Sequence, residues 1–206
     1  MAVMYSQNGV IVRRNSTFDV IGGKKYKTVK MPDGKIWLAE NLDFKFCNIG
    51  GRGELAETAF ARYYNNDEST YGWNGNKYGL LYNWPAAKFL NDNRTELCPG
   101  WRLPSKGDIE SLISACGGMN SGNLLKSKTG WNSENGTDTY GFNIYPSGAF
   151  YSDTFTNLGE FGSFSTSTLD SETTVYTMFC QNSSTIIIQP SGMHVYRPIR
   201  LVRDSN

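Results

Sequence analysis

The chain has 206 residues, a formal net charge of +1, 14% aromatic residues and 22 glycines. This length suits one large domain or two small ones, and without a Pro- or Ser-rich linker we expect a single domain. The near-neutral charge excludes bulk attraction to nucleic acid or to an anionic membrane. No apolar run approaches the roughly 20 residues of a membrane span, so we expect no membrane insertion.

The N-terminal end is interpreted as a short segment that precedes the domain. Residues 1–24 form this strand or leader segment, and residues 25–206 form the domain. The start of the chain shows no basic stretch followed by an apolar one, which is the pattern of a secretion signal. We therefore expect no signal peptide in the sequence as given.

Two strand regions are predicted before residue 40. Residues 9–14 and 25–38 have the composition of short strands, and Pro32-Asp33-Gly34 interrupts the second. Pro fixes φ and Gly accepts a positive φ, so this triplet predicts a hairpin turn. Glu40 follows beside an apolar strand, and we expect its carboxylate to be partly buried and hydrogen-bonded in a structural role.

The middle of the chain has less regular patterns. Residues 54–62 are compatible with a short helix, and residues 65–76 have the composition of a polar loop. Residues 84–91 predict a short helix with Pro85 in its first turn, where proline is well tolerated.

The strongest local signal is a capped helix that begins after Ser105. Ser105 is a good N-cap residue, and Asp108 stands where the partner of a capping box belongs. Pro104 disfavours helical geometry in the residue before it, so residues 101–103 are expected to be strand-like. Apolar residues at helical spacing and two terminating glycines follow: Ile109, Leu112, Ile113, Cys116, Gly117 and Gly118.

Beyond residue 118 the helical signal disappears. The remaining sequence is rich in Gly, Ser, Thr, Asn and aromatic residues with brief apolar runs, which is typical of short strands joined by long loops. The order of elements predicts an α+β fold with two helices, short antiparallel strands and a long loop-rich C-terminal half. The runs interpreted as strands are 142–145, 175–179, 186–188 and 195–202.

Few residues suit metal binding or nucleophilic catalysis. His194 is the one histidine, which excludes histidine-rich metal sites, and no G-x-S-x-G elbow is present for a catalytic serine. The cysteines Cys47, Cys98, Cys116 and Cys180 are widely spaced. We expect free buried thiols, with a Cys98–Cys116 disulfide as the alternative.

We expect structural roles for the C-terminal arginines and for most of the tryptophans. Arg197, Arg200 and Arg203 have the spacing of solvent-facing charges on a strand edge. Trp73 stands in a polar loop, where it is a candidate ligand contact, with packing over the core as the alternative. The tryptophans expected in the core are Trp37, Trp84, Trp101 and Trp131.

Several ordered motifs carry a family resemblance. They are GKIWLAENL at 34–42, YGLLYNWPAA at 78–87, CPGWRLP at 98–104 and RPIR at 197–200. In this order they resemble the Fibrobacter succinogenes major paralogous domain family, whose members have a C-type-lectin-like fold. The chain departs from the family pattern at Ser165, where a tryptophan is usual.

The resemblance extends to three other groups that share the scaffold. Variable proteins of diversity-generating retroelements, which include phage receptor-binding proteins, end in a similar strand. The Trp101–Pro104 segment is similar to that of formylglycine-generating enzymes, but these rely on a late cysteine pair, and only Cys180 is late here. Sugar-binding C-type lectins use a carboxylate-bearing calcium motif where this chain has Gln189-Pro190-Ser191, so no metal site is expected.

On this scaffold the ligand face is built from segments late in the chain. These segments, 151–157, 166–174, 181–185 and 189–196, are rich in Ser, Thr, Asn, Gln and Tyr. That mix suits adaptable, water-mediated recognition, and solvated loops without a binding role are the alternative. The candidate ligand-binding residues are Trp73, Tyr151, Asp153, Thr166, Thr168, Thr174, Tyr176, Gln181, Asn182, Ser184, Gln189, Ser191, Met193, His194 and Tyr196.

The resemblance implies a non-catalytic protein that binds a cell-surface glycan or protein and needs no cofactor. A phage receptor-binding or retroelement-diversified protein on the virion surface is the leading interpretation. A bacterial surface adhesin or lipoprotein is the first alternative, and an oxidase of the formylglycine-generating type is the second. Nucleic acid is not expected as a partner, and assembly into a homo-oligomer is left open.

Overall fold

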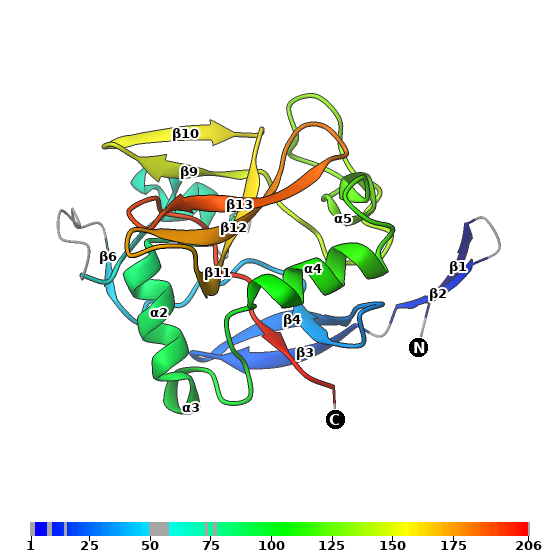
Figure 1. The fold of residues 1–206 in the computed structure, drawn as a ribbon, viewed down its shortest axis with the longest axis horizontal. Coiled ribbons are helices and arrows are strands. Elements are labelled where there is room, and N and C mark those ends of the chain that lie inside the picture. Colours follow the sequence, from blue (N-terminus) through cyan, green and yellow to red (C-terminus); the bar gives the residue numbers. More distant parts are fainter. Residues whose placement is uncertain are drawn as a thin grey trace.

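The computed structural model describes residues 3–7, 10–14, 16–49, 58–72, 74–75 and 78–205. In this part of the chain the fold is mixed α+β, with mostly antiparallel strands and five short α-helices (Figure 1). The α+β class is therefore confirmed, whereas the predicted number of two helices is too low. None of the described helices is long and apolar enough to cross a membrane.

The elements follow one another along the chain. The strands are β1 Val3–Gln7, β2 Val10–Arg14, β3 Ser16–Ile21, β4 Lys24–Lys30, β5 Ile36–Leu38, β6 Asn48–Ile49, β7 Phe60–Arg62, β8 Leu81–Tyr82, β9 Ser147–Tyr151, β10 Thr154–Leu158, β11 Gly162–Leu169, β12 Thr174–Cys180, β13 Ile186–Gly192 and β14 Val202–Arg203. The helices are the 3-10 helix η1 Tyr64–Asn66, α1 Glu68–Tyr71, α2 Trp84–Asp92, α3 Arg94–Leu97, α4 Lys106–Ala115 and α5 Gly122–Leu125.

A four-stranded antiparallel sheet has the order β14-β5-β4-β3. The predicted hairpin joins β4 to β5, and Gly34 in its turn has a φ of +83°. The carboxylate of Asp33 accepts a 2.9 Å hydrogen bond from the Lys35 backbone N–H, which fixes the turn. β3 pairs with β4 along its whole length, so the expected domain start at residue 25 falls inside a hairpin.

Helix α4 has the predicted cap at its N-terminus. Ser105 Oγ accepts from the Asp108 N–H at 3.1 Å, and Asp108 Oδ2 accepts from the Ser105 N–H at 2.7 Å. Gly117 and Gly118 follow the helix with φ values of +113° and +85°. In Figure 1 the helix lies between the β3–β4 hairpin and β11–β13. Its apolar face belongs to one buried cluster that contains Val29, Trp37, Ile109, Leu112, Ile113, Phe164 and Met178.

Helix α2 begins where the sequence predicts it and ends at Asp92. Asn83 Oδ1 caps it by accepting from the Ala86 N–H at 3.1 Å, and Pro85 lies in the first turn. Its buried face packs in a second cluster, together with residues of β4, β5 and the C-terminal segment. This cluster contains Tyr26, Leu38, Leu42, Ala86, Leu90, Trp101 and Leu201.

Predictions for three short segments are wrong. Residues 60–62 form strand β7 rather than a helix because they pair with β8, and residues 54–57 of that prediction lie outside the described residues. The expected polar loop contains α1, whose N-cap Asp67 accepts from the Thr70 N–H at 3.1 Å. Helix α5 follows residue 118, where the sequence predicts no helix.

The strands predicted late in the chain are confirmed in part. The strands predicted at 175–179 and 186–188 lie within β12 and β13, which form a three-stranded sheet with β11. Residues 142–145 make an isolated bridge between Ile144 and Lys126 instead of a strand. Residues 195–202 also pair mainly through single bridges, because this segment passes several partners in turn.

The C-terminal segment connects the separate sheets. Bridges join Tyr196 to β9 and Arg197 to β8, and Val202 pairs with β5. The prediction that Arg197, Arg200 and Arg203 present solvent-facing charges is wrong for the first two, which are 4% and 1% exposed. They are buried because the segment runs between sheets rather than along an edge.

Arg200 is held by a complete set of buried acceptors. Its Nε and Nη2 donate to Asn41 Oδ1 at 3.2 and 2.9 Å. Its other N–H groups donate to the carbonyl oxygens of Leu38, Phe142 and Asn143. Burial lowers the pKa of the guanidinium to about 10, so it keeps its charge at neutral pH and serves as an internal cross-link.

Most of the predicted core is present. Glu40 is buried and accepts a 2.7 Å hydrogen bond from the Lys27 N–H, as expected. Of the tryptophans expected in the core, Trp84 is only half-buried, and the buried ones are Trp37, Trp101 and Trp131. All four cysteines are free; Cys98, Cys116 and Cys180 are buried, and Cys47 is partly so.

Candidate functional site

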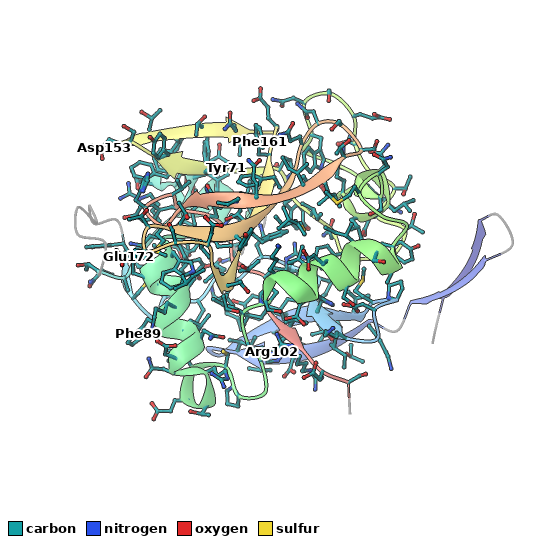
Figure 2. All side chains as sticks on the ribbon, viewed as in Figure 1. Tyr71, Phe89, Arg102, Asp153, Phe161 and Glu172 are labelled. Carbon is teal, nitrogen blue, oxygen red and sulfur yellow. The ribbon has the colours of Figure 1, made fainter. Side chains whose placement is uncertain are left out.

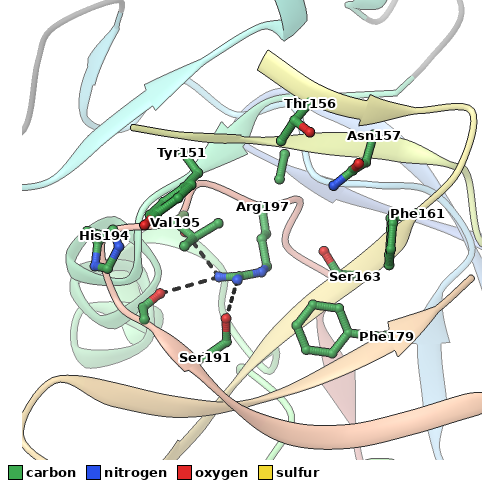
Figure 3. A pocket seen from close by; sticks show the side chains of 12 residues that line it. Tyr151, Thr156, Asn157, Phe161, Ser163, Phe179, Ser191, His194, Val195 and Arg197 are labelled. Atoms are coloured by element: carbon green, nitrogen blue, oxygen red, sulfur yellow. Dashed lines mark hydrogen bonds between the residues drawn. The ribbon is translucent and has the colours of Figure 1, made fainter. Parts of the chain in front are cut away.

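The late segments of the chain enclose a pocket of about 390 Å³. Its walls come from the β9–β10 hairpin, from β11 and β12, and from the turn after β13 (Figure 3). The bridge between Phe150 and Tyr196 ties the hairpin to the C-terminal segment. The pocket therefore lies where the β9–β10 hairpin, the β11–β13 sheet and the C-terminal segment meet.

The β9–β10 hairpin forms one wall through a tight two-residue turn. Ser152 and Asp153 both adopt the left-handed conformation, with φ values of 49° and 58°, and such turns match the twist of paired strands. The turn follows Tyr151, which is 50% exposed at the pocket rim. The Tyr151 ring lies 5.2 Å from the ring of His194 between centroids, so two aromatic groups from different segments meet at the rim.

Arg197 contributes a buried positive charge to the pocket. Its Nη1 donates to the carbonyl oxygens of Val195 at 3.2 Å and Gly192 at 3.5 Å, and its Nη2 donates to Ser191 Oγ. Its Nε, which is also buried, has no hydrogen-bond partner. Burial lowers the pKa of this guanidinium to about 9, which still leaves it protonated at neutral pH.

The remaining lining combines aromatic surfaces with small polar groups. Phe161 and Phe179 face the pocket beside Ser163, and the Arg197 guanidinium lies 5.6 Å from the Phe179 ring centroid. Thr156 and Asn157 from β10 complete the polar part. A cavity with apolar walls and a few converging polar groups is typical of small-ligand sites.

No Asp or Glu is among the residues that line this pocket. Figure 2 places Asp153 at the tip of the β9–β10 hairpin and Glu172 at the tip of the β11–β12 hairpin. Both are exposed. The charge inside the pocket is therefore positive.

Three of the predicted binding residues line the pocket together: Tyr151, Ser191 and His194. Asp153 and Gln189 are exposed but do not line it. Met193 is half-buried, and its carbonyl accepts a 3.0 Å hydrogen bond from the Trp84 N–H. Trp73 lies outside the described residues.

Several other predicted binding residues have structural contacts instead. Thr166 is fully buried and donates to the Tyr176 carbonyl at 2.8 Å, and Tyr196 is buried against the ring of Phe150. Thr166 and Tyr196 are therefore buried in internal contacts and do not line the pocket.

The remaining candidates surround the same sheet away from the pocket. Thr168 accepts from the Lys106 N–H at 3.0 Å, and the ring of Tyr176 lies 4.3 Å from Lys106 Nζ. Thr174 donates to Asp170 Oδ2 at 3.0 Å within the β11–β12 turn. Near α5 lie Gln181, Asn182 and Ser184. The Asn182 carbonyl oxygen accepts a hydrogen bond from Lys126 Nζ, and the Ser184 carbonyl oxygen accepts one from the Gly122 N–H.

Sequence reasoning misses the inner part of the pocket. Thr156 and Asn157 fall in a predicted late segment, but their residue types do not mark them as ligand contacts. Phe161, Phe179 and Arg197 have no local signal that separates them from core or edge residues. Only the fold brings these three side chains to one cavity.

The described residues offer little to metal or thiol chemistry. They contain no group of three His, Cys, Asp or Glu side chains that would hold a metal ion. Burial raises the pKa of Cys98 to about 11 and that of Cys47, Cys116 and Cys180 to about 12. At neutral pH these thiols are protonated and therefore weak nucleophiles.

The fold and the pocket define an α+β domain with a positively charged cavity between its late strands. The chain belongs to the Fibrobacter succinogenes major domain family, whose model matches residues 32–203. This match confirms the resemblance read from the ordered motifs. Comparisons with curated proteins and with solved structures found no match.

Proposed function

We propose that this protein is a non-catalytic ligand-binding protein that recognises a cell-surface glycan or protein through the pocket between β9–β10 and the turn after β13. The observation that carries the proposal is the convergence of Tyr151, Ser191 and His194 on one cavity. These residues come from two segments that lie far apart in the sequence. Exposed aromatic anchors beside adaptable polar groups are what recognition surfaces use.

The proposal includes a C-type-lectin-like arrangement of the sheets, with the late strands carrying the ligand face. The C-terminal strand β14 pairs with β5 near the start of the domain, which supports this topology. A phage receptor-binding or retroelement-diversified protein on the virion surface is the favoured setting. A bacterial surface adhesin or lipoprotein uses the same pocket equally well.

An oxidase of the formylglycine-generating type is the less favoured alternative. Its chemistry needs a reactive late cysteine, and Cys180 is fully buried with its pKa raised to about 12 by desolvation. A thiol in this state does not reach a substrate as a thiolate. Oxidation of a cysteine-containing peptide by the wild-type protein, lost in Cys180→Ser, is the result that would revive this alternative.

The test is binding of the labelled protein to a panel of bacterial cells and glycans, with and without EDTA. Tyr151→Ala removes an anchor at the rim and is expected to weaken binding about tenfold or more. The matched control is Phe18→Ala on β3, because Phe18 is 53% exposed and does not line the pocket. Equal binding by both variants, at the wild-type level, would remove the pocket as the recognition site.

A further inference from the structure

The pocket contains a buried guanidinium that none of the described residues neutralises. Arg197 is 4% exposed, and none of the side chains that line the pocket is acidic. Desolvation lowers the pKa of Arg197 to about 9, and no carboxylate of the described residues raises it again. A buried charge without a counter-charge is costly and is normally found paired.

The hydrogen bonds of Arg197 are also incomplete. The carbonyl oxygens of Gly192 and Val195 accept from Nη1, and Ser191 Oγ accepts from Nη2. One Nη2 N–H and the buried Nε N–H are left without an acceptor among the described residues. In Figure 3 the guanidinium lies in the middle of the pocket, between Ser191 and Ser163. By contrast, all five N–H groups of Arg200 are used by the protein.

We infer that the group bound in this pocket carries a carboxylate, and that it is the carboxylate of an acidic sugar such as a uronic or sialic acid. The inference rests on the proposed binding function and names its ligand class. A carboxylate supplies the missing negative charge and can accept from the Nη2 N–H that no described residue uses, whereas Nε is too buried for a ligand to reach. Guanidinium–carboxylate hydrogen bonds are among the strongest in proteins because both partners are charged.

The walls of the pocket favour a sugar over an acidic peptide side chain. The rings of Tyr151, Phe161 and Phe179 offer flat apolar surfaces, which match the C–H faces of a pyranose. Thr156 and Asn157 offer hydroxyl and amide groups for sugar hydroxyls. A volume of about 390 Å³ is at the lower end of the range for small-ligand pockets and suits one sugar unit.

The first experiment changes the ligand and leaves the protein intact. Oligosaccharides ending in glucuronic acid or N-acetylneuraminic acid are compared with their methyl esters and with neutral glucose- or galactose-ended counterparts, by array binding and then by calorimetry. An acidic peptide and sodium acetate form two further arms. We expect the acidic sugars to bind about 10- to 100-fold more tightly than their esters, the range of one hydrogen bond between charged partners.

The second experiment changes the charge of the pocket with little change in shape. Asn157 is exposed with a φ of +60°, a conformation that Asp also tolerates. Asn157→Asp is expected to weaken binding of the acid about tenfold more than binding of its ester. The control is Asn120→Asp, which adds the same charge at an exposed position that does not line the pocket. Arg197→Lys should lose the preference for the acidic sugar over its ester, because the lysine ammonium lacks the planar arrangement of N–H groups of a guanidinium. The melting temperature of this variant checks that it is folded.

The outcomes separate the ligand class from the binding function. Equal affinity for acids, esters and neutral sugars overturns the carboxylate inference and leaves the proposed function standing. Tighter binding of the acidic peptide than of any sugar overturns the sugar assignment. Binding of acetate as tight as that of the acidic sugars also overturns it, because the sugar ring then contributes nothing. No binding to any cell, glycan or peptide overturns the proposed function together with this inference.

Discussion

Arg197 and Arg200 lie three residues apart in the same C-terminal segment, and both are buried, yet only Arg200 has every N–H group hydrogen-bonded. Arg200 joins β5, the following loop and residues 142–143. Arg197 has three of its five N–H groups hydrogen-bonded by the described residues, and it lines the pocket. The fold therefore satisfies the two arginines to different degrees, and we propose that Arg200 holds the fold together while Arg197 binds the ligand.

Replacing Arg200 should destabilise the whole domain. Arg200→Leu leaves Asn41 Oδ1 and three buried carbonyl oxygens without their donor, and breaking such a buried polar network costs about 3–5 kcal/mol. Urea unfolding followed by tryptophan fluorescence measures this loss. Arg94→Ala is the control, because Arg94 is exposed on α3 and should change stability by less than about 0.5 kcal/mol. A loss below about 1 kcal/mol in Arg200→Leu would contradict the cross-linking role.

Asp108 should make the stability of the domain sensitive to acid. Burial by itself raises the pKa of this carboxyl, but hydrogen bonds from Arg102 and Ser105 outweigh it and hold the pKa well below the ordinary value of 3.8. A carboxyl with a depressed pKa stabilises the fold above its unfolded-state pKa, and that stability is lost as the pH falls below it. The unfolding free energy should therefore decrease below about pH 4.

The variant Asp108→Asn isolates this contribution. It should cost about 1–3 kcal/mol at pH 7 and flatten the decrease at acid pH. Asp92→Asn on α2 is a suitable comparison because Asp92 is exposed and pairs only with Lys88 along its own helix. An unchanged pH profile in Asp108→Asn would show that another carboxyl controls acid unfolding.

Gly148 is required where β9 approaches β10. It has a φ of +64°, and an added Cβ would collide with the Thr156 carbonyl oxygen and lie 2.9 Å from the Leu158 nitrogen. Gly148→Ala should therefore cost at least about 2 kcal/mol and distort the pocket wall. Gly100→Ala is the control that measures backbone strain without a steric collision, because Gly100 has a φ of +80° and open space around an added Cβ. Its expected cost is about 1–2 kcal/mol, and a similar loss in both variants would exclude the collision.

The buried thiols should be unreactive in the folded protein. Cys98, Cys116 and Cys180 are enclosed, and their pKa values are raised by burial. At pH 8 we expect a thiol reagent such as DTNB to modify them only after denaturant is added, while partly exposed Cys47 reacts slowly. Fast modification of two or more cysteines under native conditions would show that the core opens readily.

The sequence predicts those elements whose signals are local. Ser105 with Asp108, Pro85 near a helix start, and Pro32-Asp33-Gly34 each specify their structure through hydrogen bonds or φ preferences within a few residues. All three are present in the fold. The same holds for the ordered family motifs, which span most of the matched region.

The remaining features depend on contacts between distant segments. β7 has the composition of a helix but pairs with β8, so tertiary pairing overrides local propensity. Arg197 and Arg200 have the spacing of exposed edge residues, and only their position between sheets shows that they are buried. The polar side chain of Thr166 suggests exposure, but it is satisfied internally by Tyr176. The pocket could be predicted as a region, from the late segments, but not as a set of contacts.

We propose the pocket between β9–β10 and the turn after β13 as the ligand site. Hydrogen–deuterium exchange, measured with and without the tightest-binding glycan from the panel, tests it most directly. The account predicts slower exchange at residues 149–157 and 191–197 on addition of that glycan, and no change with a glycan that does not bind. Protection confined to residues 181–185 or to α2, with the pocket segments unchanged, would contradict the account.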